Sequence, residues 1–477
     1  MKVLEFFKEI SRIPRGSGNE KAISDYLAAF GKARGLTVKQ DSAFNVVIYK
    51  PGTPGHENHL PLILQSHMDM VCEKNADTVH DFLTDPISLH KEGDFLYANG
   101  TTLGADNGVG VAISLAVLDS DDIVHPPLEV VFTAEEETTM EGISALDANW
   151  LSARRMINLD SGDDSTFCVG CAGGGRLYLT VPVIREAIPA EMIRKPLTVR
   201  GLSGGHSGTE IHLSKANSIQ ILGRTLDTLK NEIDIRIINV SGGLKANAIP
   251  READAQIALP ASDAGKAEQI LVTLQQTLRT EYRVSDPGIT LAISQCTEPA
   301  EATEGCFTQE SAQKVISAML LVPYGVLHMS CDISGLVETS NNIGVIETTA
   351  EGVSMDCALR SSVYSRRLFA CAQIEALAAA LGAKVEFTHG YPGWTYNPDS
   401  PLLAAAIAEY RQLYNEEPTV EAIHAGLECG FMMEKIPDMD IISYCGRIYD
   451  AHTPNEHLSI SSLEKVWKYT LSLLSRL

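Results

Sequence analysis

The sequence predicts an α/β fold built around a mostly parallel mixed sheet that helices flank. Two observations predict it. Short apolar runs typical of buried strands alternate with helical patterns, and polar side chains stand directly after several of these runs. The runs that indicate buried strands cover residues 60–64, 128–132, 156–159 and 439–443.

Apolar spacing also predicts two helices. Val3, Phe6, Phe7 and Ile10 repeat at the helical period, and the charged residues among them interrupt the apolar core that a secretion signal needs. We therefore expect an amphipathic helix of the mature protein at the N-terminus. A second helix is expected just after Asp106, where a long apolar stretch follows.

Composition and charge exclude several classes of partner. The chain has 61 acidic and 38 basic residues, which gives a formal net charge of -23. Such a charge repels nucleic acids and anionic membrane surfaces. No uninterrupted apolar stretch approaches the roughly 20 residues that a membrane span needs. We expect a cytoplasmic protein that binds neither nucleic acid nor membrane.

The ten cysteines favour reduced thiols over a disulfide framework, because they are spread over a chain of 477 residues without a secretion signal. Cys168 and Cys171 form one Cys-x-x-Cys pair. A glycine-rich tract follows this pair, and the sequence contains no second pair of the same spacing. We therefore favour a buried structural role for these cysteines over zinc or redox chemistry.

Polar side chains mark the ends of the predicted strands. His67 and Asp69 follow the first run, and three consecutive glutamates, residues 135–137, follow the second. Asp160 follows the third run. A charge run after a strand is usually a solvated loop. Side chains just past the carboxyl ends of parallel strands converge on one crevice, however, so the joint placement predicts a functional site.

The residue types at these positions indicate metal chemistry. Imidazole nitrogen combined with carboxylate oxygen suits zinc, manganese or cobalt better than calcium. Two neighbouring ions need a bridging carboxylate and a ligand set each. Asp106, in a glycine-rich turn before a helix, offers a further carboxylate, and His452 near the C-terminus can supply a second imidazole. An isolated histidine in a polar loop is more often inert.

Five of these motifs together resemble the metal-site motifs of the dinuclear zinc exopeptidases, the family that includes carnosinase, aminoacylase and carboxypeptidase G. They cover residues 67–69, 104–108, 135–137, 158–160 and 451–454. Further matches narrow the resemblance to dipeptidases of that family. These cover residues 204–208, 247–252, 391–394 and 424–430. The resemblance spans nearly the whole chain.

The resemblance implies a role for each residue of the metal site. Asp106 would bridge two divalent ions, zinc being expected with manganese or cobalt as alternatives. One ion would be completed by His67 and Asp160, and the other by Glu137 and His452. In this family the peptide bond after the bridging aspartate is often cis, so we expect a cis bond between Asp106 and Asn107.

Two further carboxylates would take part in catalysis. Asp69 would hydrogen-bond the other nitrogen of the His67 ring and fix its tautomer. Aligning the glutamate triplet with the family pattern makes Glu136 the general base and leaves Glu135 as a solvated neighbour. Glu136 would take a proton from a water that the metals activate and pass it to the leaving amine.

The implied architecture is a zinc-exopeptidase-like catalytic domain, residues 1–186 and 393–477, interrupted by an inserted α+β lid domain, residues 187–392. In the lid, the resemblance suggests His206 as a contact for the developing oxyanion. Asn217 and Arg360 are candidates to hold the carboxylate terminus of the substrate. Lid movement would gate entry. A homodimer is expected.

The predicted function is therefore metal-dependent hydrolysis of dipeptides, including Xaa-His and carnosine-like substrates. One alternative is an aminoacylase or carboxypeptidase of the same family. An alternative of another class is a metal-binding or interaction protein that keeps the fold without activity; loss of Glu136 would have indicated it, and Glu136 is present.

Overall fold

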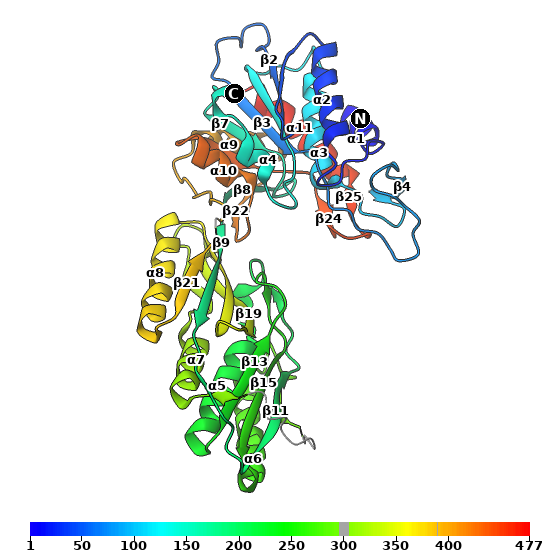
Figure 1. Ribbon diagram of the computed structural model, residues 1–477. Helices are drawn as coiled ribbons and strands as arrows, with labels where there is room; N and C mark the ends of the chain where they lie inside the picture. The colour runs from blue at the N-terminus through cyan, green and yellow to red at the C-terminus, as the bar shows by residue number, and fades with distance from the viewer. Residues whose placement is uncertain (295–304, 389) are drawn as a thin grey trace. The chain divides into compact units, whose positions relative to one another are not determined.

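The computed structural model describes residues 1–294, 305–388 and 390–477, and it divides into two compact units (Figure 1). Unit 1 comprises Met1–Cys171, Trp394–Ala422 and Leu427–Leu477. Unit 2 comprises Ala172–Gly393 and Ile423–Gly426. The predicted domains, 1–186 with 393–477 and 187–392, stay a prediction, because a compact unit need not be an independently folding domain.

Unit 1 is organised around an eight-stranded sheet of order β1-β2-β6-β3-β7-β23-β8-β22. In this order the strands are Thr37–Gln40, Val46–Lys50, Leu128–Thr133, Leu62–His67, Arg155–Asn158, Asp440–Ser443, Thr166–Cys171 and Thr419–Ile423. The four central strands, β6, β3, β7 and β23, run parallel. Strands β1, β2 and β8 pair antiparallel. The predicted α/β class with a mixed sheet is confirmed.

The predicted strands are present, and their boundaries follow local chemistry. The first run begins at Leu62 rather than at residue 60, because Leu60 is exposed and Pro61 has no amide hydrogen to donate. Every residue of β3 and β6 is buried. Both strands therefore lie inside the sheet, and the polar residues at their carboxyl ends are held on a rigid frame.

Helices pack against this sheet, with α2 on β1 and β2, α3 on β3, and α9 on β23. The helices of unit 1 are α1 Lys2–Ile10, α2 Lys21–Ala33, α3 Ala105–Leu118, α4 Glu141–Ala145, α9 Pro401–Tyr414, α10 Glu428–Lys435 and α11 Ile460–Leu474, with a 3-10 turn at Ala148–Trp150. The predicted N-terminal helix is present and buries Val3, Phe6, Phe7 and Ile10. Helix α3 is almost entirely buried, as its largely apolar sequence predicts.

A small second sheet of unit 1 has the order β24-β25-β5-β4. Its strands are Ile448–Tyr449, His457–Ser459, Phe95–Ala98 and Leu89–Glu92. The loop between β24 and β25 contains His452, so this sheet anchors both ends of that loop.

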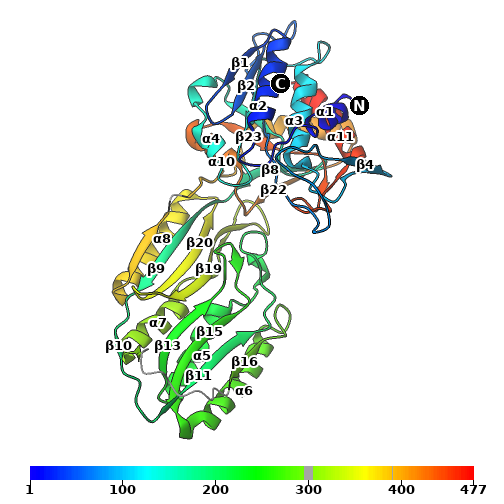
Figure 2. The same ribbon diagram turned by 45° about the vertical axis from the view of Figure 1, so that its right-hand side comes forward.

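Unit 2 is built on a nine-stranded antiparallel sheet of order β16-β11-β15-β13-β19-β20-β9-β21, with β18 paired to β19 (Figure 2). These strands are Thr290–Ile293, Met192–Arg200, Ala253–Pro260, Arg236–Gly242, Val337–Thr348, Val353–Ser361, Gly173–Val181, Lys384–Phe387 and Gly325–Met329. Short pairs are formed by β10 Arg185–Glu186 with β17 Cys306–Phe307, and by β12 Gly205–His206 with β14 Ala248–Ile249.

In the described part of unit 2, four long helices cover the sheet. They are α5 Ser218–Glu232, α6 Ala264–Glu281, α7 Gln309–Leu321 and α8 Tyr364–Leu381, with 3-10 turns at Ile211–Leu213 and Ala261–Asp263. Apolar residues of the sheet and of these helices form one continuous buried core. The expected α+β character of the inserted segment is present in this unit.

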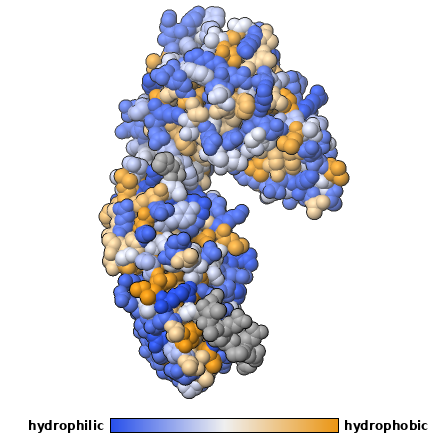
Figure 3. All heavy atoms as spheres, in the orientation of Figure 1, coloured by the Kyte–Doolittle hydropathy of each residue, from blue (hydrophilic) through white to orange (hydrophobic). Residues whose placement is uncertain are grey.

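The face of the molecule drawn in Figure 3 is largely hydrophilic, in keeping with the high net charge. Apolar side chains gather over α8, where Leu368 and Phe369 are exposed. Cys168 and Cys171 are both buried in β8, as expected for structural cysteines. Among the residues that the structure describes, no helix combines the length and the apolar character that crossing a bilayer requires.

Candidate metal centre

The parallel strands of unit 1 bring the predicted ligands to one edge of the sheet. Strand β3 ends at His67, β6 ends just before the glutamate triplet, and β7 ends two residues before Asp160. Asp106 lies at the start of α3 in a non-helical conformation. Ligand atoms of His67, Asp106 and Glu137 all lie within 4.8 Å of one another.

His67 lies between two carboxylates. Its Nε2 is 3.3 Å from Asp106 Oδ1 and 3.3 Å from Asp160 Oδ1. The side chains of His67 and Asp160 are 1% and 5% exposed. The donors of His67 and Asp160 are therefore buried, and with the partly exposed Asp106 they face one point.

His452 lies against the other side of Asp106. Its Nε2 is 3.3 Å from Asp106 Oδ2 and 3.0 Å from Glu137 Oε1. Its side chain is 49% exposed, whereas that of Glu137 is 7% exposed, so this second set is open to solvent on the His452 side. The two oxygens of Asp106 thus face different imidazoles. One carboxylate is shared between two donor sets, which is the arrangement that a bridging ligand requires.

Asp69 is fixed behind His67. Its Oδ1 is 3.3 Å from His67 Nδ1, the ring nitrogen that faces away from the other carboxylates. Ser17 Oγ donates to Asp69 Oδ2 at 2.7 Å, and the backbone amides of Glu136 and Glu137 donate at 3.1 and 3.2 Å. Asp69 therefore lies where it can orient the imidazole, and its hydrogen bonds hold the turn that carries the glutamates.

The three consecutive glutamates have different surroundings. Glu135 has a positive φ of 56° and its Oε2 accepts a hydrogen bond from Thr139 Oγ1 at 2.8 Å. Glu136 Oε2 is 4.0 Å from His67 Nε2, and its side chain is 11% exposed. Glu137 reaches His452. The left-handed turn at Glu135 separates that side chain from the other two.

Electrostatics couple the members of the cluster. Burial raises the pKa of Asp160 to about 6 against the opposing effect of His67. Hydrogen bonds that His452 donates to Asp106 and Glu137 raise the pKa of its imidazole to about 10. Burial lowers the pKa of His67, but Asp160, Asp106 and Asp69 outweigh burial and raise it well above its ordinary value. A cation bound by these groups therefore competes with protons.

Burial also acts on Glu136. It raises the pKa of this carboxyl well above the ordinary value, and the charges of Asp160, Glu428 and Glu137 act in the same direction while His67 opposes them. A glutamate whose proton affinity is raised in this way has the property that a general base requires.

Two residues that the sequence did not indicate support the site. Glu456 is 2% exposed, and its carboxylate accepts from the backbone amides of residues 103–106 at 2.8 to 3.3 Å. Arg15, also buried, donates to the carbonyls of Met68 and Asp69 at 3.0 Å and to that of Gly104 at 2.5 Å. Both residues hold the backbone on either side of the cluster. Glu456 lies two residues beyond the motif at residues 451–454, and no pattern identifies Arg15.

The expected cis peptide bond between Asp106 and Asn107 is present. Asn107 is fully buried, and its Nδ2 donates to the carbonyl of Leu159 at 2.5 Å, next to Asp160. This hydrogen bond connects the segment that carries Asp106 to the segment that carries Asp160.

In unit 2, His206 and Arg360 lie close enough for the charge of Arg360 to act on the imidazole. His206 Nδ1 accepts from the backbone amides of Gly208 and Thr209 at 3.3 and 3.2 Å. Arg360 is 9% exposed and donates to the hydroxyl of Tyr391 at 2.7 Å. Burial lowers the pKa of His206, and the positive charge of Arg360 lowers it further. His206 is therefore neutral near pH 7 with its proton on Nε2.

Asn217 has a structural role that the sequence did not predict. It is 1% exposed and caps α5, since its Oδ1 accepts from the amides of Ile219 and Gln220 at 2.9 and 3.3 Å. Its Nδ2 donates to the carbonyl of Ile343 at 2.8 Å. Both polar atoms are thus bonded within the fold, and the predicted contact with substrate stays a prediction.

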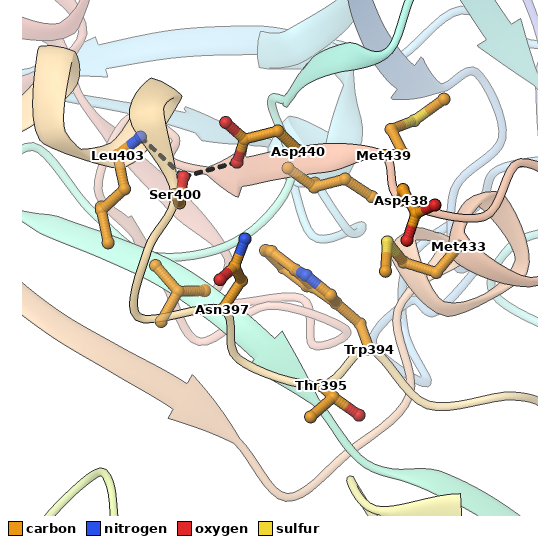
Figure 4. A pocket seen from close by; sticks show the side chains of 11 residues that line it. Trp394, Thr395, Asn397, Ser400, Leu403, Met433, Asp438, Met439 and Asp440 are labelled. Atoms are coloured by element: carbon orange, nitrogen blue, oxygen red, sulfur yellow. Dashed lines mark hydrogen bonds between the residues drawn. The ribbon is translucent and has the colours of Figure 1, made fainter.

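A separate cavity of about 350 Å³ in unit 1 offers no comparable chemistry (Figure 4). It lies beside Asp440, at the opposite end of β23 from Ser443. Ser400 Oγ donates to Asp440 Oδ1 at 2.5 Å and accepts from the amide of Leu403 at 2.9 Å. These polar groups cap α9 and are hydrogen-bonded within the fold.

Comparisons with known proteins agree over most of the chain. The model of peptidase family M20/M25/M40 matches residues 63–476. The cytosol non-specific dipeptidase of Escherichia coli K12 is 38% identical over 473 residues, which cover 99% of this chain and 97% of that protein. The crystal structure of aminoacylhistidine dipeptidase from Vibrio alginolyticus is 38% identical, with a TM-score of 0.93 over 100% of this chain and 96% of that one.

A more distant structure shares the fold alone. Aminopeptidase PepT from Bacillus cereus is 15% identical, with a TM-score of 0.57 over 99% of this chain and 97% of that one.

Proposed function

The chain belongs to peptidase family M20/M25/M40, and from this premise we propose that it is a metal-dependent dipeptidase that cleaves Xaa-His and other dipeptides. The observation that carries the proposal is the shared carboxylate of Asp106, whose two oxygens face His67 and His452. The names of the two relatives at 38% identity support dipeptides as the substrate class.

The donor set fits two divalent ions. His67, Asp160 and one oxygen of Asp106 would hold the first, and His452, Glu137 and the other oxygen would hold the second. Mixed imidazole and carboxylate donors favour zinc, with manganese and cobalt as alternatives. When bound, such ions supply Lewis acidity, which polarises a scissile carbonyl and lowers the pKa of an attacking water.

Glu136 would move the proton. Glu136 Oε2 is 4.0 Å from His67 Nε2, whereas Glu137 Oε1 is 3.0 Å from His452 Nε2. The carboxylate of Glu136 is therefore freer to accept a proton than that of Glu137. It would accept a proton from the attacking water and then deliver that proton to the leaving amine. A single carboxylate can perform both transfers, because the proton gained in the first is the one released in the second.

His206 and Arg360 would recognise the substrate. Because Nδ1 of His206 accepts two backbone hydrogen bonds, Nε2 carries the proton and can donate to a developing oxyanion. The guanidinium of Arg360 would bind the terminal carboxylate of the dipeptide, a pairing that would restrict the enzyme to short peptides.

A cytoplasmic location is part of the proposal and is supported by the name of the Escherichia coli relative. The homodimer stays a prediction.

Activity on three substrates tests the proposal. Chelator-treated protein should hydrolyse β-Ala-His and Gly-Gly only after zinc, manganese or cobalt is restored, and an N-acetyl amino acid should not be hydrolysed. Hydrolysis of the acetylated substrate alone would instead indicate an aminoacylase. Metal binding without turnover of any substrate would indicate a binding protein and would contradict the proposal.

A further inference from the structure

A row of buried polar side chains crosses the central sheet of unit 1 directly beneath the metal centre. Gln65, Asn158 and Ser443 are register partners on the neighbouring strands β3, β7 and β23. Each of the three is fully buried. The rest of these strands is mostly apolar, so three adjacent polar residues at one level depart from the pattern of a buried parallel sheet.

The row is a continuous chain of hydrogen bonds. Ser443 Oγ donates to Asn158 Oδ1 at 2.5 Å, and Asn158 Nδ2 donates to Gln65 Oε1 at 2.5 Å. Gln65 Nε2 then donates to Glu428 Oε2 at 2.5 Å. Thr133 Oγ1, on β6, donates to the same oxygen at 2.6 Å. Four parallel strands and the first residue of α10 are joined by this network.

Every donor in the row points in the same direction, toward Glu428. Because Glu428 Oε2 accepts, the amide nitrogen of Gln65 must point toward Glu428 and its oxygen toward Asn158. The amide of Asn158 must in turn point its oxygen toward Ser443. Glu428 therefore sets the orientation of both side-chain amides. Hydrogen bonds aligned in this way reinforce one another in a buried environment.

The row lies two residues before the ligands of one ion. Gln65 comes two residues before His67, and Asn158 comes two residues before Asp160. Because residues two apart in a strand share a face, Gln65 lies on the same face of β3 as His67. Ser443 also binds the far side of Asp160, because its Oγ accepts from the amide of Ser161 at 3.0 Å. The row thus fixes the separation of the strand ends that carry His67 and Asp160.

We propose that the row formed by Glu428, Gln65, Asn158 and Ser443 is a positioning network for the ion held by His67 and Asp160. This inference rests on the proposed function, because it assigns a purpose to residues next to the proposed ligands. Residues of the row touch neither metal nor substrate. They act by holding two ligands at the spacing that one ion needs, and the ion of Glu137 and His452 depends on them much less.

Cobalt titration of chelator-treated protein tests the proposal, with calorimetry for affinity and visible absorption for ligand geometry. Wild type should bind two ions. In Ser443→Ala and Glu428→Leu, one of the two should bind about tenfold more weakly or worse, with altered absorption. Glu428→Gln retains an acceptor oxygen and should remain within about threefold of wild type.

Glu129 provides the matched control. It is a buried carboxylate on β6, 5% exposed, and it accepts from Ser152 rather than from the row. Glu129→Leu should lower thermal stability and leave both cobalt affinities unchanged. An equal loss of affinity in Glu129→Leu would overturn the proposal, because it would show a general effect of core damage.

The remaining outcomes separate this proposal from the proposed function. If wild type binds two ions and Ser443→Ala also binds both with unchanged affinity and absorption, the positioning network is refuted and the dipeptidase is not. If Glu428→Leu does not fold, Ser443→Ala still decides, since it removes a single hydroxyl. Wild-type protein that binds no cobalt would overturn both proposals.

Discussion

Adjacent glutamates at the candidate metal centre differ in their surroundings and therefore in their expected roles. Glu135 Oε2 is bonded to Thr139, whereas Glu136 is buried beside His67. Removal of a general base typically costs about 10²- to 10⁴-fold in rate. We expect Glu136→Gln to lower kcat by that order with little change in metal content, as measured by steady-state kinetics and metal analysis.

Glu135→Gln is the matched control for that substitution. It changes a side chain that faces away from the cluster, so kcat should stay within about twofold of wild type. If Glu135→Gln loses activity and Glu136→Gln does not, the register of the triplet is assigned wrongly by one residue.

Glu428 predicts a pH-dependent stability. Burial raises its pKa to about 8, with His67 opposing the shift. Between its ordinary pKa and about 8 the folded protein keeps a proton that the unfolded chain releases, so stability falls as pH rises through this window. The Tm of chelator-treated Glu428→Gln relative to wild type should therefore increase from about pH 5 to about pH 8 and then level off. A constant difference would contradict this pKa.

The sequence predicts those site residues whose position follows from a strand end. His67, Asp160 and the glutamates come directly after apolar runs, and parallel strands bring them together. Arg15 and Glu456 act through backbone contacts formed only in the folded protein, so residue type and spacing do not indicate them. Asp106 and His452 lie outside strands, and the family resemblance was needed to assign them.

At the scale of elements, the cap of α5 yields a prediction about Asn217. Loss of an N-cap typically costs about 0.5–2 kcal/mol. Asn217→Ala should lower the free energy of unfolding by that amount while KM for dipeptides stays unchanged, as chemical denaturation and kinetics can measure. Thr308→Ala, which removes the cap of α7 in the same unit, is the control. A raised KM in Asn217→Ala alone would support the predicted contact with substrate.

Glu456 yields a second prediction at this scale. Its carboxylate holds the backbone of residues 103–106, which places Asp106 at the start of α3. Glu456→Ala should therefore weaken metal binding about 10- to 100-fold, measured by competition with a chelator. Unchanged affinity would show that the turn keeps its shape without this carboxylate.

Elements were predicted better than their boundaries. Apolar runs identify β3, β6, β7 and β23 because buried parallel strands consist largely of apolar residues. Strand starts differ by one or two residues where local chemistry intervenes, as Pro61 does before β3. The order of strands in the sheet depends on long-range pairing and could not be read from the runs themselves.

At the scale of the whole molecule, the proposed ligands come from five distant segments of unit 1. Binding to the folded state protects the segments that the ligand connects. Zinc should slow hydrogen exchange in peptides covering residues 62–69, 103–108, 133–137, 157–161 and 448–457, and leave β11 and β15 of unit 2 unchanged. Uniform protection across both units would argue against a site confined to these segments.

The central claim is that Asp106 joins two ions held by His67 with Asp160 and by Glu137 with His452. Anomalous diffraction from crystals grown with zinc tests it most directly. The account predicts two peaks about 3.5–4 Å apart, one on each side of the Asp106 carboxylate. A single peak, or peaks remote from these five side chains, would contradict it.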